Sequence, residues 1–314
     1  MNAPVITTAG AYSDIDASDY HRNANLLPGP SLSSSGAKLI LNQSPFHFWH
    51  DSALNPDRPR EDDAPHFSVG KAAHDMLLLE GRWADAYHVL PDGFNSAHSK
   101  KWADAIAERD AAEKSGMCVL RFQDMQVVDR VVSAIRRNAF AINALTNGES
   151  EVTLAWQDHK RGVWLRARPD FLPNSIRIGS RVMILPDLKF MAGSQCDPVG
   201  FGRAIAIFGY HQSLAFYADG IKAVFDRKPT HFLLVVVEKD APHSVSLYEV
   251  PAEDIERGRW LNRKAIDLFA DCLERDRWPG YADEPRQVGL PAWERKRIDD
   301  SGIWNEPTQW PDAA

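Results

Sequence analysis

The chain has 314 residues, enough for one large domain or two modest ones, and its 44% hydrophobic and 25% charged residues are ordinary for a globular protein. No stretch approaches the roughly 20 apolar residues of a membrane span, and residues 1–12 lack the basic start and apolar run of a secretory signal, which favours a cytoplasmic location without membrane contact. The net charge of −7 disfavours a nucleic-acid partner, but residues 160–228 carry eleven basic and five acidic side chains and form either a basic centre that can hold a polyanion or an ordinary solvated face.

The first half of the chain has helical patterns. Residues 1–30 are polar and poorly patterned, so we expect a flexible N-terminal arm there. After the arm, hydroxyl residues that can cap a helix precede apolar residues at helical spacing. The predicted helices cover residues 36–41 (ended by Pro45), 69–79, 99–114 and 122–145.

The character of the sequence changes at residue 147, where strand patterns begin. Strands are predicted at 151–156, 162–168, 182–185, 231–237 and 244–250, and helices at 198–224 and 253–275. This order predicts an α/β (or α+β) fold in which helices flank a mixed central sheet. We expect a single domain over residues 31–281, with a mainly helical part (31–146) and a sheet-containing part (147–281), followed by a loosely ordered tail (282–314).

Two strand ends carry acidic residues that could meet. Asp170 ends the strand 162–168, and Pro186-Asp187-Leu188-Lys189 follows the buried strand 182–185. Because strand side chains alternate between faces, Asp187 and Lys189 should point one way and Leu188 into the core. Two neighbouring carboxylates need a cation, and oxygen ligands, including the Leu188 carbonyl, suit Mg²⁺ or Mn²⁺.

The lysine in this pattern suggests hydrolysis of a phosphodiester bond. Lys189 would orient or deprotonate an attacking water and stabilise charge on the phosphate, which is what metal-assisted hydrolysis needs. An Asp-x-Lys triplet usually marks a solvated turn. The upstream Asp170, the buried strand before the triplet and the long helix after it favour a site here.

These segments, in their order along the chain, resemble nucleases of the RecE (exonuclease VIII) type, which belong to the PD-(D/E)xK superfamily. The core of the resemblance consists of GVWLRARPD (162–170), PDLK (186–189) and GYHQSLAFYADG (209–220). It extends to SSSGAKLILNQSPFHF (33–48), VGKAAHDMLLLE (69–80) and WPGY (278–281). Each motif is weak alone, but the ordered set is specific and implies a restriction-endonuclease-like core with a helical N-terminal extension.

The resemblance assigns roles to individual residues. It implies that Asp170 and Asp187 bind the metal ion, that His74 faces it and that Lys189 is catalytic. Glu151 resembles an additional acidic ligand, although a solvated turn is an equal alternative there. His74 would otherwise be an ordinary core histidine on an apolar helix.

A Gln-x-x-x-Tyr motif of the family is matched only in part. Tyr217 fits, but Ser213 stands four residues before it and the glutamine is Gln212, about 100° away on a helix. Which of the two faces the site stays open. Arg166 and Arg168 lie on one strand face and could bind phosphate, with structural ion pairing as the equal alternative.

Several other chemistries are excluded by their missing motifs. The sequence contains no Walker A motif and no Gly-x-Ser-x-Gly nucleophile elbow. The cysteines Cys118, Cys196 and Cys272 lie far apart, which excludes a disulfide framework and a four-cysteine metal cluster. Absence of that cluster favours the phage and prophage type of enzyme.

The expected function is therefore Mg²⁺-dependent exonucleolytic degradation of linear double-stranded DNA for recombination. The resemblance implies 5′→3′ polarity, a ring-shaped homo-oligomer and a single-strand annealing protein as a partner. The alternatives are a nuclease that acts on single-stranded DNA or as an endonuclease, and a catalytically silent DNA-binding module of the same fold.

Overall fold

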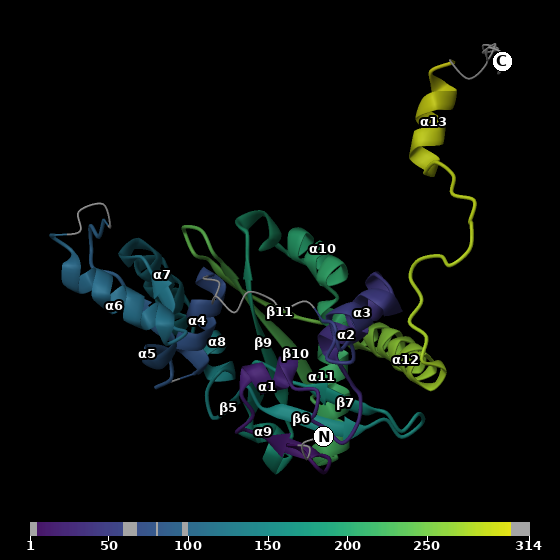
Figure 1. Ribbon diagram of the computed structural model, residues 1–314, viewed down its shortest axis with the longest axis horizontal. Helices are drawn as coiled ribbons and strands as arrows, with labels where there is room; N and C mark the ends of the chain where they lie inside the picture. Colours follow the sequence, from purple (N-terminus) through teal and green to yellow (C-terminus); the bar gives the residue numbers. More distant parts are fainter. Residues whose placement is uncertain (1–4, 59–67, 80, 96–99, 303–314) are drawn as a thin grey trace. The chain divides into compact units, whose positions relative to one another are not determined.

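The computed structural model describes residues 5–58, 68–79, 81–95 and 100–302 (Figure 1). The chain forms two compact units, residues 1–278 and residues 279–314. The second unit holds helix α13 (Ala292–Asp300), none of whose residues is buried. The end of the predicted tail, residues 303–314, lies outside the described residues. None of the helices in the described ranges has both the length and the apolar character that a bilayer crossing requires.

The strands of the first unit form two main sheets and two short pairs. The four-stranded sheet has the order β1 (Gly10–Tyr12), β6 (Thr153–Gln157), β7 (Trp164–Ala167) and β2 (Ser31–Ser33). The three-stranded sheet has the order β11 (Val245–Glu249), β10 (His231–Glu238) and β9 (Ile184–Met191). Each combines parallel and antiparallel neighbours. The short pairs are β3 (Tyr87–Val89) with β4 (Cys118–Leu120), and β5 (Gly148–Ser150) with β8 (Phe171–Pro173).

Helices of the first unit occupy the intervals between these strands. In chain order they are α1 (Ala17–Arg22), α2 (Ser34–Asn42), α3 (Pro45–Asp51), α4 (Val69–Leu78), α5 (Trp83–Ala86), α6 (Ala103–Lys114), α7 (Phe122–Arg137), α8 (Ala139–Ala144), α9 (Asn174–Ile178), η1 (Gly193–Gln195), α10 (Pro198–Phe208), α11 (Tyr210–Phe225) and α12 (Ala252–Arg275). The predicted α/β fold with mixed sheets and flanking helices is confirmed.

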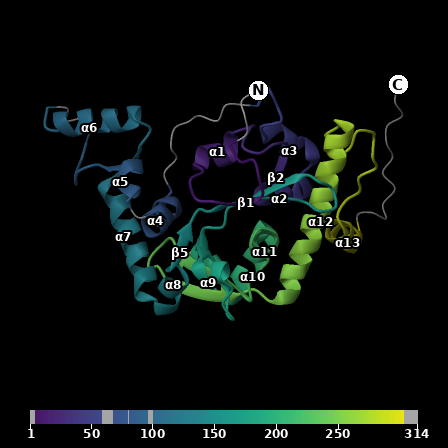
Figure 2. The same cartoon turned by 90° about the horizontal axis from the view of Figure 1, so that it is seen from below.

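The sheet of β9, β10 and β11 is covered on both faces. Along β10, Leu234 and Val236 belong to one apolar core, whereas Val235 and Val237 belong to another. The first core includes residues of α2, α11 and α12, and the second includes residues of α4, α7 and α8. Figures 1 and 2 show these two helix groups on opposite sides of the strands. This burial explains the continuous apolar run of β10, because a strand covered on both faces has no solvent side.

Residues 5–30, the described part of the expected flexible arm, are instead packed against the sheet. Strand β1 pairs antiparallel with β6, and Ile6, Tyr20, Leu26 and Leu27 are buried in a small third core. These apolar residues are too widely spaced for a helical or strand period, so the sequence pattern did not reveal them. Their burial against β6 and β7 orders the segment.

Three of the predicted elements are extended or broken in the structure. Strand β9 continues through the Asp-Leu-Lys triplet, which therefore lies inside the strand, because β10 pairs with all eight of its residues. The helix predicted for 122–145 is broken at Asn138, whose side chain caps α8. The helix predicted for 198–224 is two helices, α10 and α11, separated by Gly209.

Gly209 provides a test of this helix break. Its φ of +65° is in the left-handed region, and an added Cβ would lie 2.9 Å from the Lys38 side chain. We expect Gly209→Ala to lower the free energy of unfolding by about 1–2 kcal/mol, measured by urea unfolding. Gly202→Ala is the matched control in α10, where nothing lies within 4 Å of the added Cβ; it should stabilise by about 0.5–1 kcal/mol. Equal effects of the two substitutions would show that the break does not depend on Gly209.

Candidate metal-binding site

Asp170, Asp187 and Lys189 meet at the free edge of β9. Asp170 follows β7, and its Oδ2 accepts a hydrogen bond of 2.9 Å from the Leu188 backbone N–H. Asp187 and Lys189 share one face of β9, and the Lys189 Nζ lies 2.5 Å from Asp187 Oδ2 and 3.9 Å from Asp170 Oδ2. One ammonium group therefore lies against two carboxylates, in the place where the sequence led us to expect paired acids.

Burial and the neighbouring charges together shift the pKa values of these three groups. Burial and the nearby Asp170 carboxylate raise the pKa of Asp187, although Lys189 opposes them. The pKa of Asp170 lies well below its usual range, because Lys189, His74 and the Leu188 N–H outweigh its burial. The pKa of Lys189 is raised, because the two carboxylates outweigh desolvation of the ammonium. The pair thus has unequal proton affinities, as expected for adjacent carboxylates.

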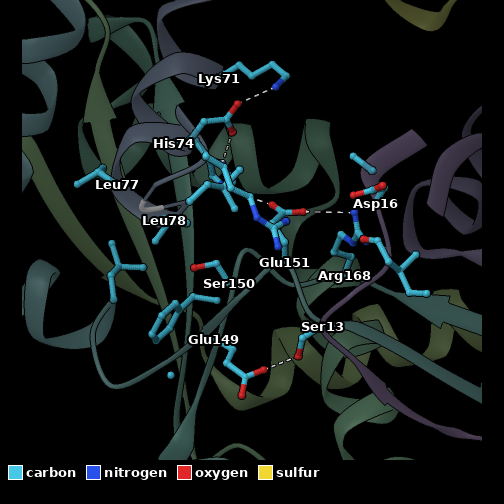
Figure 3. Close-up of a pocket in the computed structure, with 18 of the residues that line it drawn as sticks. Ser13, Asp16, Lys71, His74, Leu77, Leu78, Glu149, Ser150, Glu151 and Arg168 are labelled. Carbon is cyan, nitrogen blue, oxygen red and sulfur yellow. Dashed lines mark hydrogen bonds and ion pairs between the residues drawn. The ribbon is translucent and has the colours of Figure 1, made fainter. Parts of the chain in front are cut away.

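His74 and Glu151 approach Asp170 from the other side. The His74 Nε2 lies 3.4 Å from Glu151 Oε1 and 3.8 Å from Asp170 Oδ1. Potential ligand atoms of His74, Glu151 and Asp170 all lie within 4.8 Å of one another. Figure 3 shows His74 and Glu151 directed toward each other in the lining of a pocket of about 830 Å³.

The backbone at Glu151 holds its carboxylate in this position. Glu151 has a φ of +56°, a left-handed conformation that is uncommon for residues other than glycine. Its N–H donates a hydrogen bond to the Asp170 carbonyl oxygen, which ties the two acidic residues together. Strained residues cluster at functional sites, so this conformation favours a site role for Glu151 over the solvated turn that was the alternative.

Asp75 orients His74, and the sequence did not single it out. The His74 Nδ1 lies 3.0 Å from Asp75 Oδ1, while Asp75 Oδ2 accepts hydrogen bonds from Lys71 (2.8 Å) and Tyr87 (2.7 Å). With its Nδ1–H directed at Asp75, a neutral His74 presents the Nε2 lone pair to Glu151 and Asp170. Burial lowers the pKa of His74, but hydrogen bonds with Asp170 and Asp75 and the charges of Asp170 and Glu151 raise it to about 10. The only sequence signal for this contact was an aspartate directly after the histidine. The hydrogen bond from Tyr87, twelve residues after Asp75, had no such signal.

Tyr217 belongs to the surroundings of the site through helix α11. Burial and then Asp187 and Asp170 raise its pKa well above the usual value, so both carboxylates act on its hydroxyl. Ser213 precedes Tyr217 by one turn and shares its helix face. Gln212 is buried, its Oε1 is near Gly209, and its Nε2 has no hydrogen-bond partner among the described residues.

Arg166 and Arg168 are held by internal contacts. Arg168 has a side chain only 6% exposed; it lies 3.7 Å from Glu151, donates to Thr153 and the Ile15 carbonyl, and packs on the Tyr20 ring. Arg166 donates to the hydroxyl and carbonyl of Ser31. For Arg168 the contacts favour the structural ion pairing that was the alternative to phosphate binding.

Two further residues near the site, Lys38 and Tyr210, were not assigned a role from the sequence. Lys38 on α2 donates to the Phe208 carbonyl at 3.1 Å, and burial, followed by the charge of Lys189, lowers its pKa. The Lys189 Nζ lies 5.2 Å from the ring centroid of Tyr210. Lys38 reaches the site because α2 packs against α11, which no local pattern specifies.

The donor atoms fit a hard divalent cation. Asp187 Oδ1 is buried without a hydrogen-bond partner among the described residues, which is costly unless another group completes it. The Leu188 carbonyl accepts a hydrogen bond from Lys189, so it also faces the site. The carboxylate and carbonyl oxygens, which form most of this donor set, suit Mg²⁺ or Mn²⁺.

Comparisons with known proteins show the family and the fold. A family model described as a PDDEXK-like domain of unknown function (DUF3799) matches residues 33–287. A crystal structure of a protein from Eubacterium rectale, named as a "putative exonuclease", aligns with a TM-score of 0.54 and 13% identity, covering 87% of this chain and 93% of that one. At this identity the likeness shows a shared fold. No curated protein matches the chain.

The contact between Asp75 and His74 predicts an effect on metal binding. Asp75→Asn should lower Mn²⁺ affinity by about 10- to 100-fold, because the imidazole loses the carboxylate that fixes its orientation. His74→Ala should weaken metal binding more than DNA binding. Isothermal titration calorimetry with Mn²⁺ measures the metal affinity of each variant, and the exposed Asp85→Asn is the control. Variants that melt earlier but bind Mn²⁺ normally would make Asp75 and His74 ordinary core residues.

Proposed function

The chain belongs to the family of PDDEXK-like domains of unknown function (DUF3799), and on that premise we propose that it is a metal-dependent deoxyribonuclease. The observation that carries the proposal is the ammonium of Lys189 against Asp170 and Asp187, beside His74 and Glu151. Carboxylates that bind a cation and a lysine at the same point are the parts that phosphodiester hydrolysis requires. An ordinary ion pair would not need the second carboxylate or the histidine.

Each residue has a defined task in this proposal. Asp170, Asp187, His74, Glu151 and the Leu188 carbonyl would hold the cation, for which we propose Mg²⁺ with Mn²⁺ as a substitute. When bound, the cation polarises the scissile phosphate and lowers the pKa of a water molecule.

The neighbouring side chains act on the proton and the charge. Lys189 Nζ would orient the water and stabilise the negative charge that develops on the phosphate. Tyr217, with Gln212 or Ser213, would line the buried side of the site on α11. Arg166 and Arg168 are proposed to interact with DNA only where their internal contacts leave donor atoms available.

The proposed substrate is linear double-stranded DNA, degraded from an end. Its support is the resemblance of the motifs to RecE-type nucleases and the name of the structural neighbour from Eubacterium rectale. We further propose 5′→3′ polarity, a homo-oligomeric ring and a single-strand annealing partner, as in recombination by phage and prophage enzymes. Cytoplasmic action on DNA is part of the same proposal.

Substitutions at the Asp187–Lys189 pair test the catalytic assignment. Asp187→Asn should lower metal affinity, and Lys189→Ala should spare it, yet each should reduce cleavage by several powers of ten. Cleavage of an end-labelled duplex with Mg²⁺ measures this effect. The matched control is the exposed pair Lys222 and Asp226, where Lys222→Ala and Asp226→Asn should leave cleavage unchanged. Near-normal turnover of both site variants would refute the assignment.

The form of the DNA distinguishes the proposed exonuclease from its alternatives. Linear duplex should be degraded, whereas covalently closed circles should be spared because they offer no end. Rapid nicking of circles would leave an endonuclease in place of the exonuclease, and preference for single strands would change the substrate. If wild type and Asp187→Ala bind Mg²⁺ equally weakly in calorimetry and neither cleaves, the chain is a silent DNA-binding module.

A further inference from the structure

A second pocket, of about 530 Å³, lies next to the proposed metal site. Its walls come from the segment before β2, the first turn of α2, the residues after α3, and Arg166 on β7. We call it the basic pocket and define it by His21, Ser33, Ser35, Arg58 and Arg166. His21 lines both this pocket and the pocket of His74 and Glu151, so the two are adjacent.

The charge of the basic pocket is unbalanced. Asp51 is the one acidic residue among its described lining residues, and Asp51 is already paired with His50 at 2.7 Å. Burial lowers the pKa of His21, and the charges of Arg166, Arg168, Arg22 and Arg58 lower it further. The electrostatic potential at His21 is thus positive, whereas carboxylates dominate around His74.

Arg166 is a guanidinium without an acidic partner. It donates to Ser31, and its centre lies 5.4 Å from the Tyr20 ring. No described carboxylate lies within ion-pair distance of it, and its Nε is buried without a hydrogen-bond partner among the described residues. Desolvating a charge is costly unless an opposite charge compensates it. Arg168, two residues on, has that compensation in Glu151.

The N-terminus of helix α2 adds donor groups to the same pocket. Ser33 caps this nine-residue helix by accepting a hydrogen bond from the Gly36 N–H. The hydroxyl of the exposed Ser35 lies 3.1 Å from the Ser33 hydroxyl. The first turn of a helix carries partial positive charge and binds anions. Helix and guanidinium, from distant parts of the sequence, therefore favour the same kind of ligand.

We propose that the basic pocket binds a phosphate group of the DNA, through Arg166, Arg58 and the first turn of α2, beside the metal site. This inference rests on the proposed nuclease function, which it extends to the path of the substrate. Arg166 on β7 and Arg168 just after it are two residues apart, roughly 7 Å along extended chain, and Arg168 contacts Glu151 of the metal site. A bound strand would therefore have one phosphate at the metal ion and a neighbouring one in the basic pocket.

Inorganic phosphate alone tests the pocket independently of nuclease activity. In metal-free protein at constant ionic strength, added phosphate should raise the thermal unfolding midpoint of the wild type, because a ligand that binds only the folded state stabilises it. Arg166→Gln should abolish that shift and Arg58→Gln should reduce it. Arg257→Gln, a surface arginine paired with Asp254, removes the same charge elsewhere and should keep the shift. Each variant is compared with itself without phosphate, so a lower thermal unfolding midpoint of the variant does not affect the measured shift.

Duplex binding without divalent metal supplies the second test. Arg166→Gln should weaken affinity by about tenfold, as for loss of a charged hydrogen bond, and lower the salt slope by about one. A loss confined to duplexes with 5′-phosphate ends would identify the terminal phosphate as the ligand, and an equal loss with 5′-hydroxyl ends an internal one.

The possible results keep the two proposals separate. A phosphate shift and duplex affinity that are the same in Arg166→Gln and Arg257→Gln would overturn the basic pocket, even if the protein cleaves DNA. Loss of both in Arg166→Gln, in a protein that never cleaves DNA with Mg²⁺, would support the pocket while refuting the proposed nuclease.

Discussion

The buried contact between one lysine and two aspartates places the strongest demand on this fold. Asp187 is 2% exposed, and the ammonium of the partly buried Lys189 has Asp187 and Asp170 beside it. Like charges this close repel unless a cation lies with them. The main chain must therefore hold Asp170 and β9 in fixed register, and the Leu188 N–H bond to Asp170 does this.

The rest of the first unit supports that register. Parallel pairing with β10 leaves the other edge of β9 free for Asp170, and apolar cores pack on both faces of the sheet. Helix α4 brings His74 from one side, and the left-handed Glu151 brings a carboxylate from another. Site residues thus come from four separated segments, each fixed by its own packing, which is how a rigid scaffold pre-organises a site.

The basic segment of residues 160–228 has a more local role than its charge suggests. Many of its cations are neutralised by internal ion pairs, including those of Arg161 with Asp271, Arg177 with Glu149 and Lys222 with Asp226. Arg166 differs because its neighbours are hydroxyl, carbonyl and aromatic groups. An acidic protein can therefore offer a polyanion a few well-placed cations instead of a broad positive surface.

The sequence alone determined the fold class, most elements and the pairing of Asp170 with Asp187 and Lys189. These depend on local patterns, namely apolar periodicity, capping residues and the alternation of side chains along one strand. The sequence pattern did not show the helix break at Gly209, because a glycine can also occur inside a helix. It did not show the extension of β9, because a polar triplet resembles the end of a strand. Tertiary structure alone decided three other features. These are the packing of the N-terminal segment, the contact of Asp75 with Tyr87, and the position of Arg166 beside α2 without a described carboxylate partner. Each depends on residues distant in sequence whose proximity has no periodic signal, because only burial of the assembled sheets and helices brings them together.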